Sequence, residues 1–177
     1  MNPEIRVVGH AALGIALREE LLALCSEAYE EDFSAYFELL RGGTHVLAFE
    51  SGELVSHAAW VERELRVGAE RRPLATAYVE AVATATRWQR RGLATVVLRS
   101  LPPLLHGFAL AALSPSNAAF YTRLGWEMWQ GPLFYREADR RIATPEEEVM
   151  IHRLPKTPTD IDLGDELETD WRPVEVW

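Results

Sequence analysis

Residues 80–94 of this 177-residue chain read EAVATATRWQRRGLA, the most informative segment for its architecture. It begins as a mostly apolar strand that ends near Thr84, continues through a basic loop and enters a helix at Gly92. A helix start presents unpaired backbone N–H groups and the positive end of the helix dipole. Small residues at Gly92 and Ala94 let an anion approach those amides closely. The stretch predicts a pyrophosphate site, although an ordinary basic strand-to-helix loop with a glycine has the same pattern.

Strands and helices interleave on both sides of this stretch. We expect strands at residues 5–8, 45–50, 53–65, 75–84, 108–113 and 149–153, and helices at residues 16–31, 34–40, 92–101 and 117–124. Ser34 is the expected N-cap of the second helix. The strand at 75–84 is apolar enough to be central in its sheet. The pattern predicts one domain over residues 1–177, of the α/β or α+β class.

Composition excludes several classes of partner. The formal net charge of −9 argues against nucleic acid, because phosphate binding needs a basic surface. No segment is apolar enough to span a bilayer, and the N-terminus lacks the layout of a signal peptide, so we expect no membrane partner. The one cysteine, Cys25, lies in an apolar run and is interpreted as a small buried side chain. These features predict a cytoplasmic protein.

Two motifs resemble those of a known family. Residues 89–94 (QRRGLA) resemble the Gln/Arg-x-x-Gly-x-Gly/Ala signature of the GNAT acetyltransferases, and residues 117–126 (NAAFYTRLGW) resemble that family's second motif. Nearly the whole chain is similar to the aminoglycoside 2′-N-acetyltransferases of actinobacteria, through residues 31–34, 43–45, 56–59, 78–80 and 170–177. The resemblance implies the GNAT fold: a mixed, mostly antiparallel sheet flanked by helices, with splayed central strands at an acetyl-CoA site.

The resemblance also implies roles in direct acetyl transfer to an amine. Glu80, the one acid in a mostly apolar run, matches the general base that frees the amine of its proton. Tyr121 matches the tyrosine that protonates the departing CoA thiolate. A solvent-facing Glu80 and a Tyr121 that only packs are the alternatives. The expected cofactor-binding residues are Val82, Ala83 and Thr84 for the pantetheine arm, Gln89, Arg90, Arg91, Gly92, Leu93 and Ala94 for the pyrophosphate, and Asn117.

The resemblance implies a polycationic acceptor, and residues 155–177, with seven acids against two bases, could form an acidic surface that attracts such a cation. A merely solubilising tail explains the same charge, but Trp171 and Trp177 favour a tail that docks near the acceptor site, as in the family. The residues that match the family's acceptor site are Asp32, Glu80, the backbone of Ala81, Ser114, Glu147, Glu175 and the Trp177 carboxylate.

Some residues depart from the family pattern. Tyr36 and Phe37 stand where the antibiotic-modifying relatives have acids, and Glu175 replaces an aspartate. Another small amine, a peptide, or a non-catalytic role in binding acetyl-CoA or an aminoglycoside therefore stays open. The five histidines are scattered without metal-ligand spacing, so we expect no metal and a structural His57. A homodimer is expected from the resemblance alone.

Overall fold

The computed structural model describes residues 3–177 and divides the chain into two compact units. The first unit comprises Met1–Val61 and Val79–Pro103, and the second comprises Glu62–Tyr78 and Leu104–Trp177. Two long strands, β3 (Glu53–Val67) and β4 (Arg72–Thr84), contribute a segment to each unit. The organisation of residues 1–177 as one domain stays a prediction.

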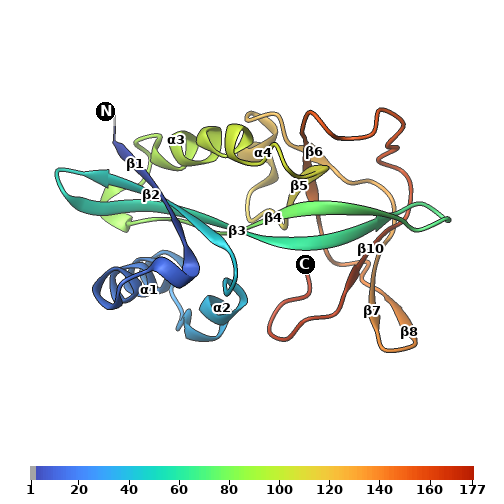
Figure 1. Ribbon diagram of the computed structural model, residues 1–177, viewed down its shortest axis with the longest axis horizontal. Helices are drawn as coiled ribbons and strands as arrows, with labels where there is room; N and C mark the ends of the chain where they lie inside the picture. The colour runs from blue at the N-terminus through green and yellow to red at the C-terminus, as the bar shows by residue number, and fades with distance from the viewer. Residues whose placement is uncertain (1–2) are drawn as a thin grey trace. The chain divides into compact units, whose positions relative to one another are not determined.

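The first unit holds an antiparallel sheet with helices on both faces (Figure 1). Its elements are β1 (Glu4–Gly9), η1 (His10–Ala12), α1 (Ile15–Tyr29), α2 (Ser34–Leu39), β2 (Thr44–Glu50), η2 (Thr86–Trp88), α3 (Leu93–Ser100) and parts of β3, β4 and η3 (Pro102–Leu104). Strand β2 pairs with β1 on one side, Val7 opposite Val46, and with β3 on the other, Val46 opposite Ala58. Helices α1 and α2 cover one face of this sheet and α3 lies on the other.

Burial of α1 against the sheet follows from its apolar stripe. Leu21, Leu24 and Cys25 lie on the buried side of the helix, in one cluster with Phe37 of α2 and Leu47 of β2. Such residues recur every three to four positions, which places them on one helical face. Burial raises the pKa of the Cys25 thiol to about 12, so it stays protonated at neutral pH. The interpretation of Cys25 as a buried side chain is confirmed.

The second unit is built on a mixed sheet. Its further elements are β5 (Leu110–Leu113), α4 (Ala118–Thr122), β6 (Glu127–Met128), β7 (Leu133–Glu137), β8 (Arg140–Ala143), β9 (Met150–Arg153) and β10 (Leu167–Asp170). The strand order is β6-β9-β5-β4-β3-β10-β7-β8. The β4–β5 and β10–β7 pairs are parallel, whereas the β5–β9 and β7–β8 pairs are antiparallel. The predicted class, with a mixed and mostly antiparallel sheet, is confirmed.

Strand β4 is central, as its sequence predicted, since β3 and β5 flank it. Its parallel register with β5 runs from Thr76 opposite Leu110 to Tyr78 opposite Ala112. Strand β4 nevertheless continues to Thr84. Residues 79–84, the last six of β4, therefore extend beyond its pairing with β5.

The acidic tail forms a strand that the sequence did not predict. We expected residues 149–153 to be the last long strand, but β10 follows at Leu167–Asp170. Strand β10 pairs in parallel with β7, Leu167 opposite Leu133, and antiparallel with β3, Leu167 opposite Val67. Its four residues include two acids, which are unfavourable in strands, so local propensity gave no signal.

A buried carboxylate on β10 explains why an acidic segment joins this sheet. Glu168 is 1% exposed and is surrounded by four arginines. Its side chain contacts Arg66 at 3.4 Å, Arg136 at 3.6 Å and Arg141 at 2.9 Å, and it pairs with Arg71. A buried charge needs such partners, because removal from water is costly. The cluster therefore ties β10 to β3, β7 and β8.

Replacing Glu168 by glutamine should destabilise the protein. The change leaves the surrounding guanidinium groups without their buried carboxylate, and breaking a buried ion pair costs about 3–5 kcal/mol. Since these arginines are partly exposed, we expect a loss near about 3 kcal/mol, or roughly 5–10 °C in Tm for a chain of this size. The calorimetric Tm should be compared with that of Glu166→Gln, which changes a half-buried neighbour that pairs with Arg141. Equal Tm values for the two variants would contradict this account.

No helix within residues 3–177 has the length and apolarity to cross a membrane. Over the same residues, no group of three or more His, Cys, Asp and Glu side chains is arranged to hold a metal ion.

Candidate active site

The predicted pyrophosphate loop lies between β4 and α3 in the first unit. Helix α3 begins at Leu93, and no side chain caps it. Gly92 has φ 80°, a left-handed conformation that favours glycine, and a Cβ built there would meet no atom within 4 Å. The backbone N–H of Gln89, in contrast, already donates to the Thr86 carbonyl at 3.3 Å. The open helix start fits a diphosphate, but the Gln89 N–H already has a partner within the loop.

The loop's three arginines differ in their surroundings. Arg87 pairs with Glu53, whose carboxylate also accepts a hydrogen bond from Trp88 Nε1 at 3.0 Å. The Arg87 guanidinium lowers the pKa of Glu53. Arg91 lies over the Trp88 ring, 4.7 Å from its centroid, and donates to the Arg87 carbonyl at 3.1 Å. Arg90 and Arg91 are exposed, so they provide the local positive charge, whereas Glu53 offsets that of Arg87.

The end of β4 is held by side chains of the first unit. Carbonyl oxygens of residues 82–84 accept hydrogen bonds from Tyr29 Oη (3.3 Å, to Val82), Ser56 Oγ (2.9 Å, to Ala83) and Gln89 Nε2 (3.3 Å, to Thr84). The Gln89 side chain therefore links the loop to the end of β4. Each carbonyl oxygen has two lone pairs, so a pantetheine arm could share these oxygens.

Glu80 and Ala81 form an irregular point within β4. Glu80 is half-buried, between the buried residues Val79 and Ala81. Ala81 has φ 52°, a left-handed conformation that costs a residue with a Cβ roughly 1–2 kcal/mol. His57 Nδ1 lies 2.8 Å from the Ala81 carbonyl oxygen and supports this conformation. The predicted base thus lies next to a strained peptide that β3 holds in place.

The description of the histidines as scattered is wrong for three of them. His10 Nδ1 lies 3.0 Å from His45 Nε2, and His45 Nδ1 lies 2.9 Å from His57 Nε2. All three are buried, and they come from η1, β2 and β3. They are 35 and 12 residues apart in sequence, so no local pattern could predict the chain that they form. We call these residues the histidine chain.

Asp32 stabilises the start of α2. Its Oδ1 accepts hydrogen bonds from the Ser34 backbone N–H at 3.0 Å and from Ser34 Oγ at 2.5 Å. These bonds lower the pKa of Asp32. The prediction that Ser34 is the N-cap is wrong, because Ser34 is already helical and Asp32 supplies the side-chain oxygen. Asp32 is exposed and carries a negative charge at neutral pH, as a site for cations requires.

The second predicted motif forms α4 in the second unit. Asn117 is the N-cap of this helix, and its Oδ1 accepts from the Phe120 N–H at 3.2 Å. Tyr121 is 5% exposed and packs edge-on against Phe120 and Trp126. Burial raises the pKa of Tyr121 to about 12, while a hydrogen bond with Ser116 acts in the opposite direction. Tyr121 is therefore a protonated phenol at neutral pH.

The C-terminal tail docks within the second unit. Trp177 is 1% exposed, and its Nε1 donates to Thr144 Oγ1 at 2.9 Å. Arg63 donates to the Val176 carbonyl at 2.7 Å and to Thr169 Oγ1 at 2.6 Å. The sequence analysis did not identify Arg63, because its partners lie more than a hundred residues away.

The other predicted acceptor residues also lie in the second unit. Ser114 is half-buried just after β5, Glu147 is exposed after β8, and Glu175 is exposed in the tail. The Glu147 N–H donates to the Thr144 carbonyl at 3.1 Å. Thr144 therefore bonds both Glu147 and Trp177, which brings these two predicted residues to one place.

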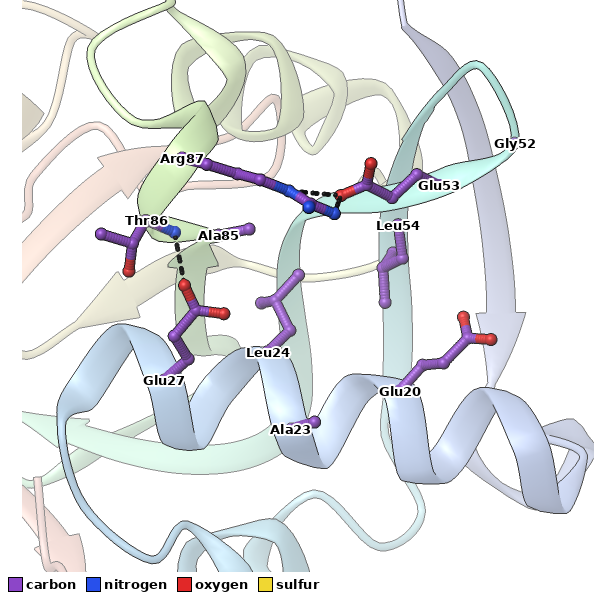
Figure 2. A pocket seen from close by; sticks show the side chains of 10 residues that line it. All are labelled: Glu20, Ala23, Leu24, Glu27, Gly52, Glu53, Leu54, Ala85, Thr86 and Arg87. Carbon is purple, nitrogen blue, oxygen red and sulfur yellow. Dashed lines mark hydrogen bonds and ion pairs between the residues drawn. The ribbon is translucent and has the colours of Figure 1, made fainter.

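An acid-lined cavity of about 680 Å³ lies in the first unit, beside α1 (Figure 2). Glu20, Glu27, Glu53 and Arg87 provide its charged groups, and Leu24 and Leu54 are part of its apolar lining. Glu27 accepts from the Thr86 N–H at 3.1 Å, and hydrogen bonds with Thr86, through its side chain and then its backbone, lower the pKa of Glu27. No residue predicted to bind a ligand lines this cavity.

Comparison with known proteins gives one family and several relatives. The family described as "Acetyltransferase (GNAT) domain" matches residues 16–129. An aminoglycoside 2′-N-acetyltransferase from Mycolicibacterium fortuitum is 36% identical over 179 residues, which cover 97% of this chain and 91% of that protein.

Solved structures share the fold. The N-acetyltransferase YhbS from Escherichia coli, crystallised with CoA, has a TM-score of 0.67 and 20% identity, over 96% of this chain and 90% of that chain. Eis1 from Mycobacterium abscessus has a TM-score of 0.59 and 22% identity, over 74% of this chain and 33% of that chain. The present chain therefore matches about a third of Eis1. At these identities the two structures establish similarity of fold alone.

Proposed function

Because the chain belongs to the GNAT acetyltransferase family, we propose that it transfers the acetyl group of acetyl-CoA to the 2′-amino group of an aminoglycoside. The observation that carries the proposal is the 36% identity to the aminoglycoside 2′-N-acetyltransferase, which extends over 97% of the chain. This similarity extends beyond the two family motifs and includes the segments that carry the residues proposed below to bind the acceptor. The acceptor is thus an amine on a polycationic molecule.

Glu80 is the proposed general base. Acetyl-CoA supplies a thioester, whose carbonyl carbon the amine attacks, so that a C–N bond forms and the C–S bond breaks. The amine of an aminoglycoside is largely protonated at neutral pH and must lose a proton to attack. Glu80, half-buried on the part of β4 that extends beyond its register with β5, accepts this proton directly or through water.

Tyr121 is the proposed general acid. Its hydroxyl is protonated at neutral pH and donates a proton to the sulfur as the C–S bond breaks, although burial, which raises its pKa to about 12, makes it a weaker acid than tyrosine in water. The neutral amine keeps only one N–H in the amide product, so its nitrogen loses a second proton as the C–S bond breaks, and this proton replaces the one that Tyr121 gives to sulfur. The first proton passes from Glu80 to solvent, so one proton is released for each acetyl group transferred to a protonated amine.

The donor is held by backbone groups of the first unit. In the proposal, the N–H groups of residues 90–94 at the start of α3 bind the diphosphate, and exposed Arg90 and Arg91 add positive charge. Residues 82–84 bind the pantetheine arm in the manner of a neighbouring strand. Asn117, which caps α4 in the second unit, is a further proposed cofactor-binding residue.

Carboxylates bind the acceptor in this proposal. Asp32, Glu147 and Glu175 are exposed acids, and the Trp177 carboxylate, the Ser114 hydroxyl and the Ala81 carbonyl complete the set. The docked tail supplies two of these groups, so it acts as part of the acceptor site.

We further propose a cytoplasmic homodimer, with a mass near twice 20.0 kDa in light scattering.

A thiol-release assay tests the proposed function. With acetyl-CoA and an aminoglycoside that carries a free 2′-amino group, we expect stoichiometric release of CoA and a product acetylated at that nitrogen. An aminoglycoside with a 2′-hydroxyl group should give no release above background, because the reacting amine is absent. Release with both compounds would point to another amine. Thermal stabilisation by acetyl-CoA without CoA release would show a non-catalytic binding protein.

A further inference from the structure

The histidine chain connects η1, the 3-10 helix that follows β1, to the peptide beside Glu80. Its hydrogen bonds run from His10 through His45 to His57, at 3.0 and 2.9 Å, and end on the Ala81 carbonyl at 2.8 Å. His45 and His57 are 0% exposed and His10 is 7% exposed. Such a chain of buried imidazoles is costly unless its donors and acceptors match.

The last bond determines the direction of all the others. A carbonyl oxygen only accepts, so His57 must carry its proton on Nδ1. Neutral His57 then accepts at Nε2, so the donor in that bond is His45 Nδ1. By the same reasoning His45 accepts at Nε2 from His10 Nδ1. One tautomer of each ring, protonated on Nδ1, satisfies all three bonds.

Cys25 does not compete with the Ala81 carbonyl for the proton on His57 Nδ1. Its Sγ lies 3.8 Å from His57 Nδ1, which already bears a proton, so the sulfur is at most a weak acceptor. At the His10 end of the histidine chain, the unprotonated Nε2 has no hydrogen-bond partner among residues 3–177. His10 packs on Phe37, and Arg18, Glu38 and Arg41 are the charged groups around it.

The rings are neutral at physiological pH. Burial lowers the pKa of His45 to about 4 and that of His57 to about 3, and burial also lowers the pKa of His10. A neutral chain with one tautomer transfers no proton to Ala81, because a carbonyl cannot take one. Its effect must therefore be on geometry.

We propose that the histidine chain positions the Ala81 peptide for acetyl transfer, with His57 as the residue that holds the peptide and His45 and His10 as the residues that keep its tautomer. The inference rests on the proposed function, in which Glu80 is the base and Val82 binds the donor. Ala81 lies between these two residues in a left-handed conformation that alanine does not favour. The bond from His57 holds it there, so the bond also sets the direction in which Glu80 projects.

Loss of this bond should reduce turnover more than binding. A displacement of about 1 Å in a reacting group can cost about 100-fold in rate. We expect His57→Gln, whose amide reaches the position of Nε2 but not that of Nδ1, to lower kcat at least about 10-fold, with the KM for the aminoglycoside little changed. His57→Asn, whose amide nitrogen reaches the position of Nδ1 and can donate to Ala81, should retain most of the turnover. His106→Gln, on an exposed histidine outside the chain, is the matched control.

A structural role alone predicts a different result. In that case His57→Asn and His57→Gln would lower Tm, and the folded fraction of each would keep the kcat of the unmodified protein. Equal kcat values for these two variants, corrected for folded protein, would overturn the proposal.

NMR of the unmodified protein tests the histidine chain independently of enzyme activity. Long-range ¹H–¹⁵N correlation on ¹⁵N-histidine-labelled protein at pH 7 should show His10, His45 and His57 as Nδ1–H tautomers. An Nε2–H tautomer at His57 would overturn the inference whatever the enzyme does. If the protein released no CoA while all three tautomers were as expected, the proposed function would fail and the hydrogen-bonded chain would stand.

Discussion

Glu80→Gln is expected to lower kcat/KM for acetyl transfer by about 10²–10⁴-fold, the range typical of a lost general base. Glutamine has nearly the same shape as glutamate but takes no proton, so the amine must lose its proton to solvent before it attacks. The loss should be greatest at low pH, where the neutral amine is scarce, and should shrink as pH rises. Initial rates of CoA release between pH 6 and pH 9 measure both effects.

Glu62→Gln is the matched control for this experiment. Glu62 lies on β3, is exposed, and has no proposed role in the reaction. Its rates should follow those of the unmodified protein at every pH. If Glu80→Gln behaves in the same way, another group accepts the proton and the assignment of Glu80 is wrong.

Tyr121→Phe should lower kcat by about 100-fold or more, with a smaller change in the KM for the acceptor. Phenylalanine keeps the ring that packs on Phe120 and Trp126 and removes only the hydroxyl. The Tyr121 hydroxyl carries a proton at neutral pH and donates it to the sulfur, whereas the variant has no such donor. Steady-state kinetics with both substrates varied separate the loss in kcat from any change in binding.

Tyr135→Phe provides the comparison for Tyr121→Phe. Tyr135 lies half-buried on β7 and has no proposed role in the reaction. Both variants should keep their Tm within a few degrees, but only Tyr121→Phe should lose turnover. Unchanged kcat in Tyr121→Phe would identify Tyr121 as a packing residue.

Local signals in the sequence were sufficient for the main elements. The apolar run before Thr84, the basic loop and Gly92 predicted β4, the loop and α3, because hydrophobic period and helix-start chemistry depend on neighbouring residues. The same is true of α1, in which the apolar spacing placed Cys25 in the core. Family motifs, which are also contiguous, were enough to name the candidate base and acid.

Features that depend on distant residues were decided by the tertiary structure. Glu168 joins the sheet because four arginines from other segments surround it, a stabilisation that exists only when those segments meet. Asp32 accepts the backbone N–H of Ser34 at the start of α2, where Ser34 itself was the expected N-cap.

The site shows the same division. Neighbouring residues alone place Glu80 on a mostly apolar strand, because the hydrophobic period is a local property of the sequence. Only the tertiary structure brings His10, His45 and His57 into one line against Ala81. Hydrogen bonds between side chains on separate strands depend on register, and register is a property of the folded sheet.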